Sequence, residues 1–152
     1  MNTTAISPDQ VINTLNNLIE LNRDGQSGFQ EAAAKMETPQ IKAFCLEQSL
    51  SRAKFVGELQ TQVHSMGVEP DTTGSVAGAL HRDWIDLKSA LGGGDAAILA
   101  ATETGEDHAV NEYVRALTES LPAPTRAMVE DQLQSISHAY ARVKELRASV
   151  DQ

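Results

Sequence analysis

Residues 68–94 read VEPDTTGSVAGALHRDWIDLKSALGGG, and this stretch decides the fold. It begins as a loop, and Ser75 then caps a short amphipathic helix that the glycines at 92–94 end. Connections in small domains are mostly a few residues long, so a longer one needs a geometric reason. One such reason is a connection that runs the full length of a helical bundle, because the helix after it then lies parallel to the helix before it.

Two long helices are expected before this connection and two after it. Apolar residues recur along each of these four segments at steps of three and four, which is the spacing of a buried helix face. Two helical hairpins joined by one long crossover form the ferritin-like layout, so the sequence predicts an all-α, ferritin-like four-helix bundle. We expect the long helices at about 8–36, 39–66, 95–120 and 124–149, and the crossover helix, between helices 2 and 3, at about 75–91.

Capping residues mark the expected helix ends. Ser7 is the expected N-cap of the first helix, Thr38 of the second and Asp95 of the third. Gly67 follows the second helix and predicts a left-handed C-cap. Gly25 lies inside the first helix, where a glycine costs on the order of 1 kcal/mol relative to alanine. Close approach of a neighbouring helix is one reason for a glycine at this position. The alternative is that the segment breaks there into two shorter helices.

The composition fits one domain over residues 1–152 with an aliphatic core. The chain is 41% hydrophobic but only 4% aromatic, which suits helix packing better than a β-sandwich. The formal net charge of -9 repels phosphate backbones and anionic lipids, so we expect neither nucleic acid nor a membrane as a partner. No apolar run approaches the ~20 residues of a membrane span, and we expect a cytoplasmic protein.

Cys45 is the only cysteine in the chain. A disulfide within the chain is therefore impossible, and so is a zinc or iron–sulfur site built from several thiolates. Because Cys45 lies on an apolar stripe, we expect a buried and unreactive thiol.

Three segments resemble a known family. They are LIELNRDG at 18–25, GSVAGALHRDW at 74–84 and GEDHAV at 105–110. The crossover segment is the most specific of the three, and the resemblance extends over nearly the whole chain. The sequence is similar to a bacterial ferritin-like family described as domain of unknown function 2383. The resemblance implies a four-helix bundle from a bacterium and brings no established activity with it.

A ferritin-like di-metal site needs a carboxylate from each of two helices and a Glu-x-x-His pair from each of the other two. At the middle of the bundle the first helix offers Asn22, and the second offers Arg52 where a Glu-x-x-His pair belongs. The third helix offers Glu106, which faces inward, and the fourth turns His138 toward solvent. A guanidinium carries a fixed positive charge and cannot become a metal ligand. The sequence therefore predicts a degenerate site that holds no metal.

A buried polar layer is the expected replacement for the metal. We expect Arg52 and Glu106 to form an ion pair inside the bundle, because an unpaired buried charge costs about 3–5 kcal/mol. Asn22, Gln48 and Tyr140 are expected to add hydrogen bonds to this pair. No cofactor is expected, and no residue pattern indicates a catalytic group. The alternative is an irregular iron or manganese site made from Glu103, Glu106 and Asp107.

Three functions compete at this stage. The first is a bundle without enzymatic activity that acts through a protein partner or a homo-oligomer such as a dimer, with Trp84 as an interface residue. The second is an iron- or manganese-binding protein, such as an oxidase, a peroxide-handling enzyme or a storage subunit. The third is a small-molecule carrier that uses a polar gap beside Gly25 and Gly28. The sequence favours the first function and leaves the physiological role, the partner and the oligomeric state open.

Overall fold

A computed structural model describes residues 7–69, 90 and 92–150 of the chain. This part of the chain is all-helical and contains no strand. Within it, no helix is both long enough and apolar enough to span a bilayer. The four long helices are α1 (Pro8–Lys35), α2 (Pro39–Ser65), α4 (Gly94–Ala116) and α5 (Ala123–Val150).

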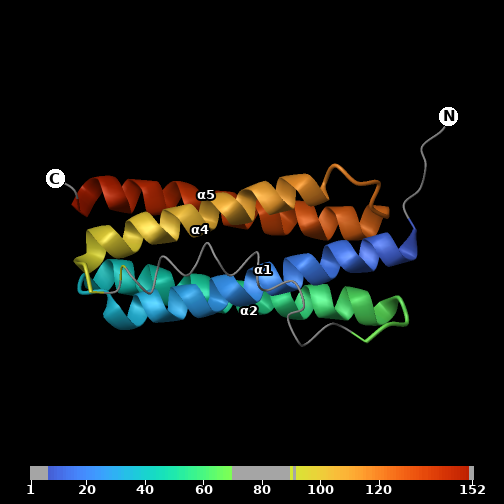
Figure 1. Cartoon of the computed structure of the whole chain (residues 1–152), viewed down its shortest axis with the longest axis horizontal. Coiled ribbons are helices and arrows are strands. Elements are labelled where there is room, and N and C mark those ends of the chain that lie inside the picture. Colours follow the sequence, from blue (N-terminus) through green and yellow to red (C-terminus); the bar gives the residue numbers. More distant parts are fainter. Residues whose placement is uncertain (1–6, 70–89, 91, 151–152) are drawn as a thin grey trace.

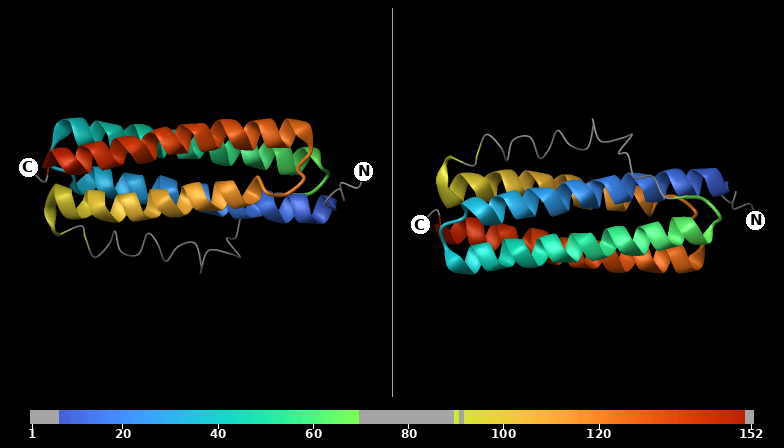
Figure 2. Two further views of the ribbon diagram at one scale, coloured as in Figure 1. Left: turned by 90° about the horizontal axis from the view of Figure 1, so that it is seen from above. Right: turned by 90° about the horizontal axis from the view of Figure 1, so that it is seen from below.

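The four helices form a bundle of two antiparallel hairpins, α1 with α2 and α4 with α5 (Figure 1). α2 ends at one end of the bundle and α4 begins at the other, so these two helices run in the same direction (Figure 2). α1 packs beside α2 and α4, and α5 packs beside the same two helices. α2 and α4 therefore face each other across a diagonal of the bundle. The expected crossover helix at 75–91, together with Trp84, lies outside the described residues apart from Ala90.

α1 is one continuous helix from Pro8 to Lys35, so the alternative of a break at Gly25 is wrong. The Ser7 hydroxyl accepts a hydrogen bond from the Gln10 amide, and the Gln10 side chain accepts one from the Ser7 amide, which makes a capping box. Gly67 follows α2 with a φ of 82°, the left-handed conformation expected for it.

We expected Asp95 to be the N-cap of α4, and this prediction is wrong. The N-cap of α4 is Gly93, and the Asp95 carboxylate instead accepts hydrogen bonds from the amides of Glu37 (2.8 Å) and Thr38 (2.9 Å) in the turn between α1 and α2. Asp95 thereby anchors the turn that leads into α2, whereas the Thr38 side chain makes no capping hydrogen bond. Partial burial alone would raise the pKa of Asp95, but these hydrogen bonds outweigh burial and lower its pKa below 3.8.

α4 ends four residues earlier than expected, at Ala116 rather than about residue 120. The turn that follows it is fixed by Arg126 of α5, whose Nη2 donates to the carbonyls of Leu117 (2.9 Å) and Glu119 (2.7 Å). The Arg126 guanidinium thus ties the start of α5 to the carbonyls of this turn.

Buried apolar side chains form two clusters along the bundle. One contains Leu15, Leu59, Tyr113 and Val129, at the end where α1 begins. The other contains Phe29, Cys45, Leu99 and Val143, at the end where α1 finishes. On α2 the gap between the clusters falls between Cys45 and Phe55, and on α4 between Ala101 and Ala109. The side chains in that gap form the candidate functional site.

Candidate functional site

An ion pair between Arg52 and Glu106 fills the gap between the two apolar clusters. Nη1 of Arg52 donates to Oε1 of Glu106 at 2.8 Å, and Nη2 donates to Oε2 at 2.6 Å. The two side chains are 2% and 0% exposed. Two parallel charge-assisted hydrogen bonds are the strongest form of such a pair. Because Arg52 lies on α2 and Glu106 on α4, the pair bridges the diagonal of the bundle.

Gly25 of α1 makes room for the Arg52 side chain, and Phe29 of α1 contacts it. A Cβ atom added at Gly25 would lie 3.2 Å from Nη1 of Arg52, tighter than most real contacts, so the glycine permits a close approach there. The guanidinium carbon lies 5.2 Å from the centroid of the Phe29 ring, within the range of a cation–π interaction. Arg52 thus occupies the space beside Gly25 in which a small-molecule carrier would need its cavity.

A second polar network lies beside the ion pair and joins all four helices. Nδ2 of Asn22 donates to the hydroxyl of Tyr113 at 2.7 Å, and that hydroxyl donates to Oε1 of Gln132 at 2.6 Å. Nε2 of Gln132 then donates to Oε1 of Glu58 at 3.0 Å. The chain of donors and acceptors therefore runs from α1 through α4 and α5 to a half-buried carboxylate on α2.

The Leu18 carbonyl sets the direction of this network, because it accepts the second hydrogen bond of Asn22 Nδ2 at 2.8 Å. With the amide held in that orientation, the Tyr113 hydroxyl must donate onward to Gln132. Burial raises the pKa of Tyr113 well above its ordinary value, so the phenol stays protonated and able to donate. Within the described residues, Oδ1 of Asn22 and Nε of Arg52 make no hydrogen bond, so the ion pair and this network are separate.

Tyr140 does not belong to the buried layer, which corrects the sequence-based prediction. Its hydroxyl donates to Oδ1 of Asp107 at 3.1 Å in an exposed contact on the outside of α4 and α5. α5 turns Gln132, Ile136 and Ala139 inward, and a residue one position after Ala139 points about 100° away. Gln48, also assigned to the layer, is half-buried one turn before Arg52.

The three carboxylates considered as metal ligands point to three different partners. Glu103 accepts from Arg147 at 3.3 Å, Glu106 is paired with Arg52, and Asp107 accepts from Tyr140. Among the residues that the structure describes, no three His, Cys, Asp or Glu side chains are grouped so that they could hold a metal ion. The residues at the middle of the bundle do not fit a di-metal centre, because the Arg52 guanidinium occupies both carboxylate oxygens of Glu106.

Sequence reasoning assigned no polar role to Tyr113, Gln132 or Glu58. A signal for Gln132 was present, because Val129, Gln132 and Ile136 follow each other at steps of three and four. The more apolar Leu133 competed for the same stripe, and it is only half-buried. A buried glutamine beside a buried tyrosine is a recognisable pair of donor and acceptor once the helices are placed.

A comparison with protein families gives one match. Residues 10–119 match the model of the family described as Domain of unknown function (DUF2383). The chain belongs to this family. No curated protein matches the chain.

The DUF2383 match includes α1, α2 and α4, and it ends before α5 begins at Ala123. Both members of the ion pair lie within the matched region, as do Asn22, Tyr113 and Glu58. Gln132, which connects Tyr113 to Glu58, lies outside it. Both residues of the ion pair thus belong to the matched region, whereas the second network also needs Gln132 of α5, outside that region.

Cys45 is buried beside the ion pair, in the cluster with Phe29. Burial, together with the negative charges of Asp95 and Glu106, raises the pKa of its thiol to about 12. A thiol that stays protonated is a poor nucleophile, so Cys45 serves packing.

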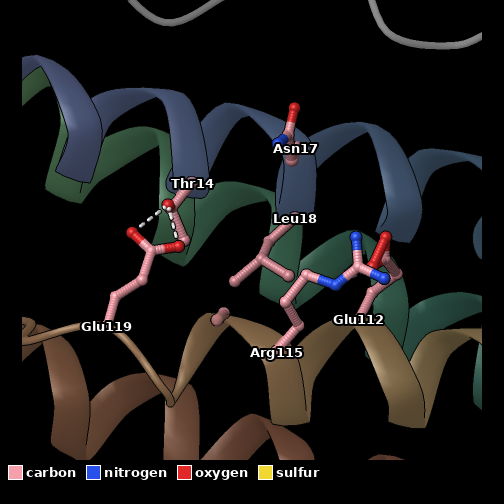
Figure 3. A pocket seen from close by; sticks show the side chains of 7 residues that line it. Thr14, Asn17, Leu18, Glu112, Arg115 and Glu119 are labelled. Atoms are coloured by element: carbon pink, nitrogen blue, oxygen red, sulfur yellow. Dashed lines mark hydrogen bonds and ion pairs between the residues drawn. The ribbon is translucent and has the colours of Figure 1, made fainter.

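A small cavity of about 80 Å³ lies between α1 and α4, away from the ion pair (Figure 3). At one side of it the Thr14 hydroxyl lies 2.8 Å from both carboxylate oxygens of Glu119. At the other side Arg115 lies 3.7 Å from Glu112. Pockets for small-molecule ligands usually measure about 300–1,000 Å³, so this cavity suits a few water molecules. Its polar groups tie the start of α1 to the end of α4.

Proposed function

We propose that this protein is a bacterial, cytoplasmic, ferritin-like bundle that has no enzymatic activity and acts through protein partners or self-association. In this proposal the Arg52–Glu106 pair stands where a ferritin-like protein would bind its metal ions. The observation that carries it is the bidentate ion pair at the middle of the bundle, buried on both sides. The parallel directions of α2 and α4 support the ferritin-like layout (Figure 1).

The ion pair argues against metal chemistry through its charge and its geometry. An arginine side chain carries a fixed positive charge, so Arg52 repels a cation from the centre of the bundle. Both oxygens of Glu106 accept hydrogen bonds from that guanidinium, which leaves the carboxylate engaged. A metal ion would have to displace Arg52 from a buried position, at a cost of about 3–5 kcal/mol for the broken pair.

Elemental analysis of untagged protein tests this proposal. Wild type, Glu106→Gln and the control Glu103→Gln are purified without chelators, and iron and manganese are measured per chain. We expect no stoichiometric metal in any of the three, and we expect Glu106→Gln alone to be clearly less stable. Stoichiometric iron or manganese that is lost in Glu106→Gln would overturn the proposal in favour of a metalloprotein using Glu103, Glu106 and Asp107.

Trp84 is the proposed contact residue for a partner or a second copy, on the ground that tryptophan is enriched at interface anchors. Light scattering of wild type and Trp84→Ala tests this part of the proposal. An oligomer that the substitution dissociates supports self-association through Trp84. An oligomer that the substitution leaves intact removes Trp84 from the interface.

A further inference from the structure

The outer face of α2 carries two leucines in solvent. Leu46 is 47% exposed and Leu50 is 72% exposed, although both are large apolar side chains in the interior of a helix. They lie one turn apart on the same face. Lys42 and Lys54 are exposed one turn before and one turn after them. We call the row Lys42, Leu46, Leu50 and Lys54 the α2 outer stripe.

Gly57 extends this face and has no role inside the molecule. A Cβ atom added at Gly57 would meet nothing within 4 Å, whereas one at Gly25 would press on Arg52. A glycine within a helix weakens that helix relative to alanine. Close approach of another backbone from outside explains why a glycine is found at this exposed position.

A shallow groove between α2 and α5 begins where the stripe ends. Its lining includes Lys54 and Gly57, so the stripe and the groove form one continuous surface. The other lining residues are Glu58, Thr61, Gln62 and Met128. A rod-shaped ligand lying along α2 would contact the leucines, the glycine and the groove in turn.

The charges of the stripe decide between possible occupants. If a second copy packed its stripe antiparallel, Lys42 would come to the level of Lys54 of the other copy at both ends. In a parallel pairing each lysine would meet its own counterpart. Like charges brought together in this way disfavour both symmetric dimers. The exposed Glu47 lies beside the leucines at the middle of the stripe, and the two lysines stand at its ends.

A helix with apolar side chains in its middle and carboxylates at both ends matches the stripe in shape and in charge. Lys42 and Lys54 are twelve residues apart along the helix, about 18 Å at 1.5 Å per residue, so the carboxylates would lie about three turns apart. An anionic membrane surface carries negative charge without this spacing, so the spacing of the lysines favours a helix.

We propose that the α2 outer stripe docks an acidic amphipathic helix of a partner protein. The inference rests on the proposed function, because it names the chemistry of the partner through which that function would work. It follows the common mode in which an amphipathic helix is held by anchors at steps of three and four residues.

Selection from a displayed library of helical peptides tests the inference on the full chain. Peptides are selected on wild type and depleted on a Leu46→Ser/Leu50→Ser variant, and the affinity of the enriched peptides is measured by fluorescence anisotropy. We expect enriched peptides to carry acids at both ends and apolar residues between them. Leu50→Ser should weaken their binding at least about tenfold, and added salt should weaken it further.

Two further variants sharpen the result. Gly57→Ala should raise the melting temperature while weakening peptide binding, because the new methyl group strengthens the helix and blocks close approach. Val114→Ser removes another half-exposed apolar side chain, on α4, and should leave binding unchanged. Enriched peptides that are neutral or basic, or that bind the Leu46→Ser/Leu50→Ser variant equally well, would overturn the inference, and so would a library that yields no enriched peptide.

Two other occupants are separated from this one by direct measurement. Self-association of wild type that Leu50→Ser abolishes would make the stripe an interface between copies. Co-sedimentation with vesicles of phosphatidylglycerol that depends on Leu50 would make it a membrane contact. The first result overturns this inference and keeps the proposed function, whereas stoichiometric metal overturns the proposed function and leaves the peptide result standing.

Discussion

α4 carries two glutamates, three residues apart, that each reach an arginine on another helix. Glu106 meets Arg52 at 2.6 Å with both side chains buried, and Glu103 meets Arg147 at 3.3 Å with the side chains 25% and 42% exposed. The chemistry of the two pairs is the same, and the surroundings differ. An exposed pair contributes about 0–1 kcal/mol, while breaking a buried pair costs about 3–5 kcal/mol. The contribution of each pair to stability is therefore set by its burial, since both pairs join a glutamate to an arginine.

The largest effect is expected from the buried pair. Glu106→Gln keeps the shape of the side chain and removes its charge, which leaves Arg52 as an unpaired cation between two apolar clusters. We expect a loss of about 3–5 kcal/mol in the free energy of unfolding, measured by urea denaturation. Glu103→Gln, the matched change in the exposed pair, should cost less than about 1 kcal/mol. Equal losses in the two variants would show that burial does not separate the pairs.

Replacing both members of the buried pair extends this test. Arg52→Met together with Glu106→Leu should recover most of the stability lost in Glu106→Gln, because apolar side chains avoid the cost of buried charge. A double variant that stays as unstable as Glu106→Gln would mean that the ion pair itself holds α2 and α4 together.

The second network should show an intermediate effect. Tyr113→Phe removes the hydroxyl that accepts from Asn22 and donates to Gln132, and it leaves both amide groups buried with one partner fewer. We expect a loss of about 1–3 kcal/mol in urea denaturation. Tyr140→Phe is the control, because the hydroxyl of Tyr140 makes only an exposed contact, and its cost should be below about 0.5 kcal/mol. A larger effect at Tyr140 than at Tyr113 would contradict the assignment of the layer.

These residues also show what the sequence could predict. Arg52 and Glu106 lie on apolar stripes at similar distances from their helix ends, and a charge in that position needs an opposite charge at the same depth. The bundle, its helices and this pair could therefore be predicted from periodicity. Which of Tyr113 and Tyr140 belongs to the buried layer could not be predicted, because that depends on the rotation of α5 about its axis. Gln132 and Leu133 each complete an inward stripe of helical spacing, so the sequence leaves this rotation open.

Asp95 shows a second limit of sequence reasoning. Aspartate before a helix is a strong capping signal, and the local pattern gives no reason to place its carboxylate elsewhere. Its partner amides, at Glu37 and Thr38, are 58 and 57 residues away along the chain. Only the meeting of the first turn of α4 with the turn between α1 and α2 brings them together, and that meeting is a property of the whole bundle.

The same contact predicts a pH dependence. The pKa of Asp95 is lowered from 3.8 in the folded protein, so its contribution to stability is present above the unfolded value and is lost as the pH falls through the folded value. Asp95→Asn removes the charge and one of the two acceptor oxygens, and it should cost about 1 kcal/mol near neutral pH. The difference between wild type and Asp95→Asn should shrink below pH 3.8. Urea denaturation of both proteins from neutral to acidic pH measures it, and a difference that grows in acid would contradict the sign.

The smallest effect is expected at Arg147, and its response to salt completes the comparison of the two pairs. Arg147→Gln should cost about 0–1 kcal/mol in dilute buffer, because both partners are partly solvated. At about 1 M salt the screening length falls to about 3 Å, so this cost should vanish. Arg52→Gln strands the Glu106 carboxylate where ions do not penetrate, and its cost should persist in the same salt. Urea denaturation of both variants at low and high salt separates the two cases. If salt reduced both costs alike, the pair at the middle of the bundle would have to be open to solvent, and its proposed role as the replacement for a metal centre would fail with it.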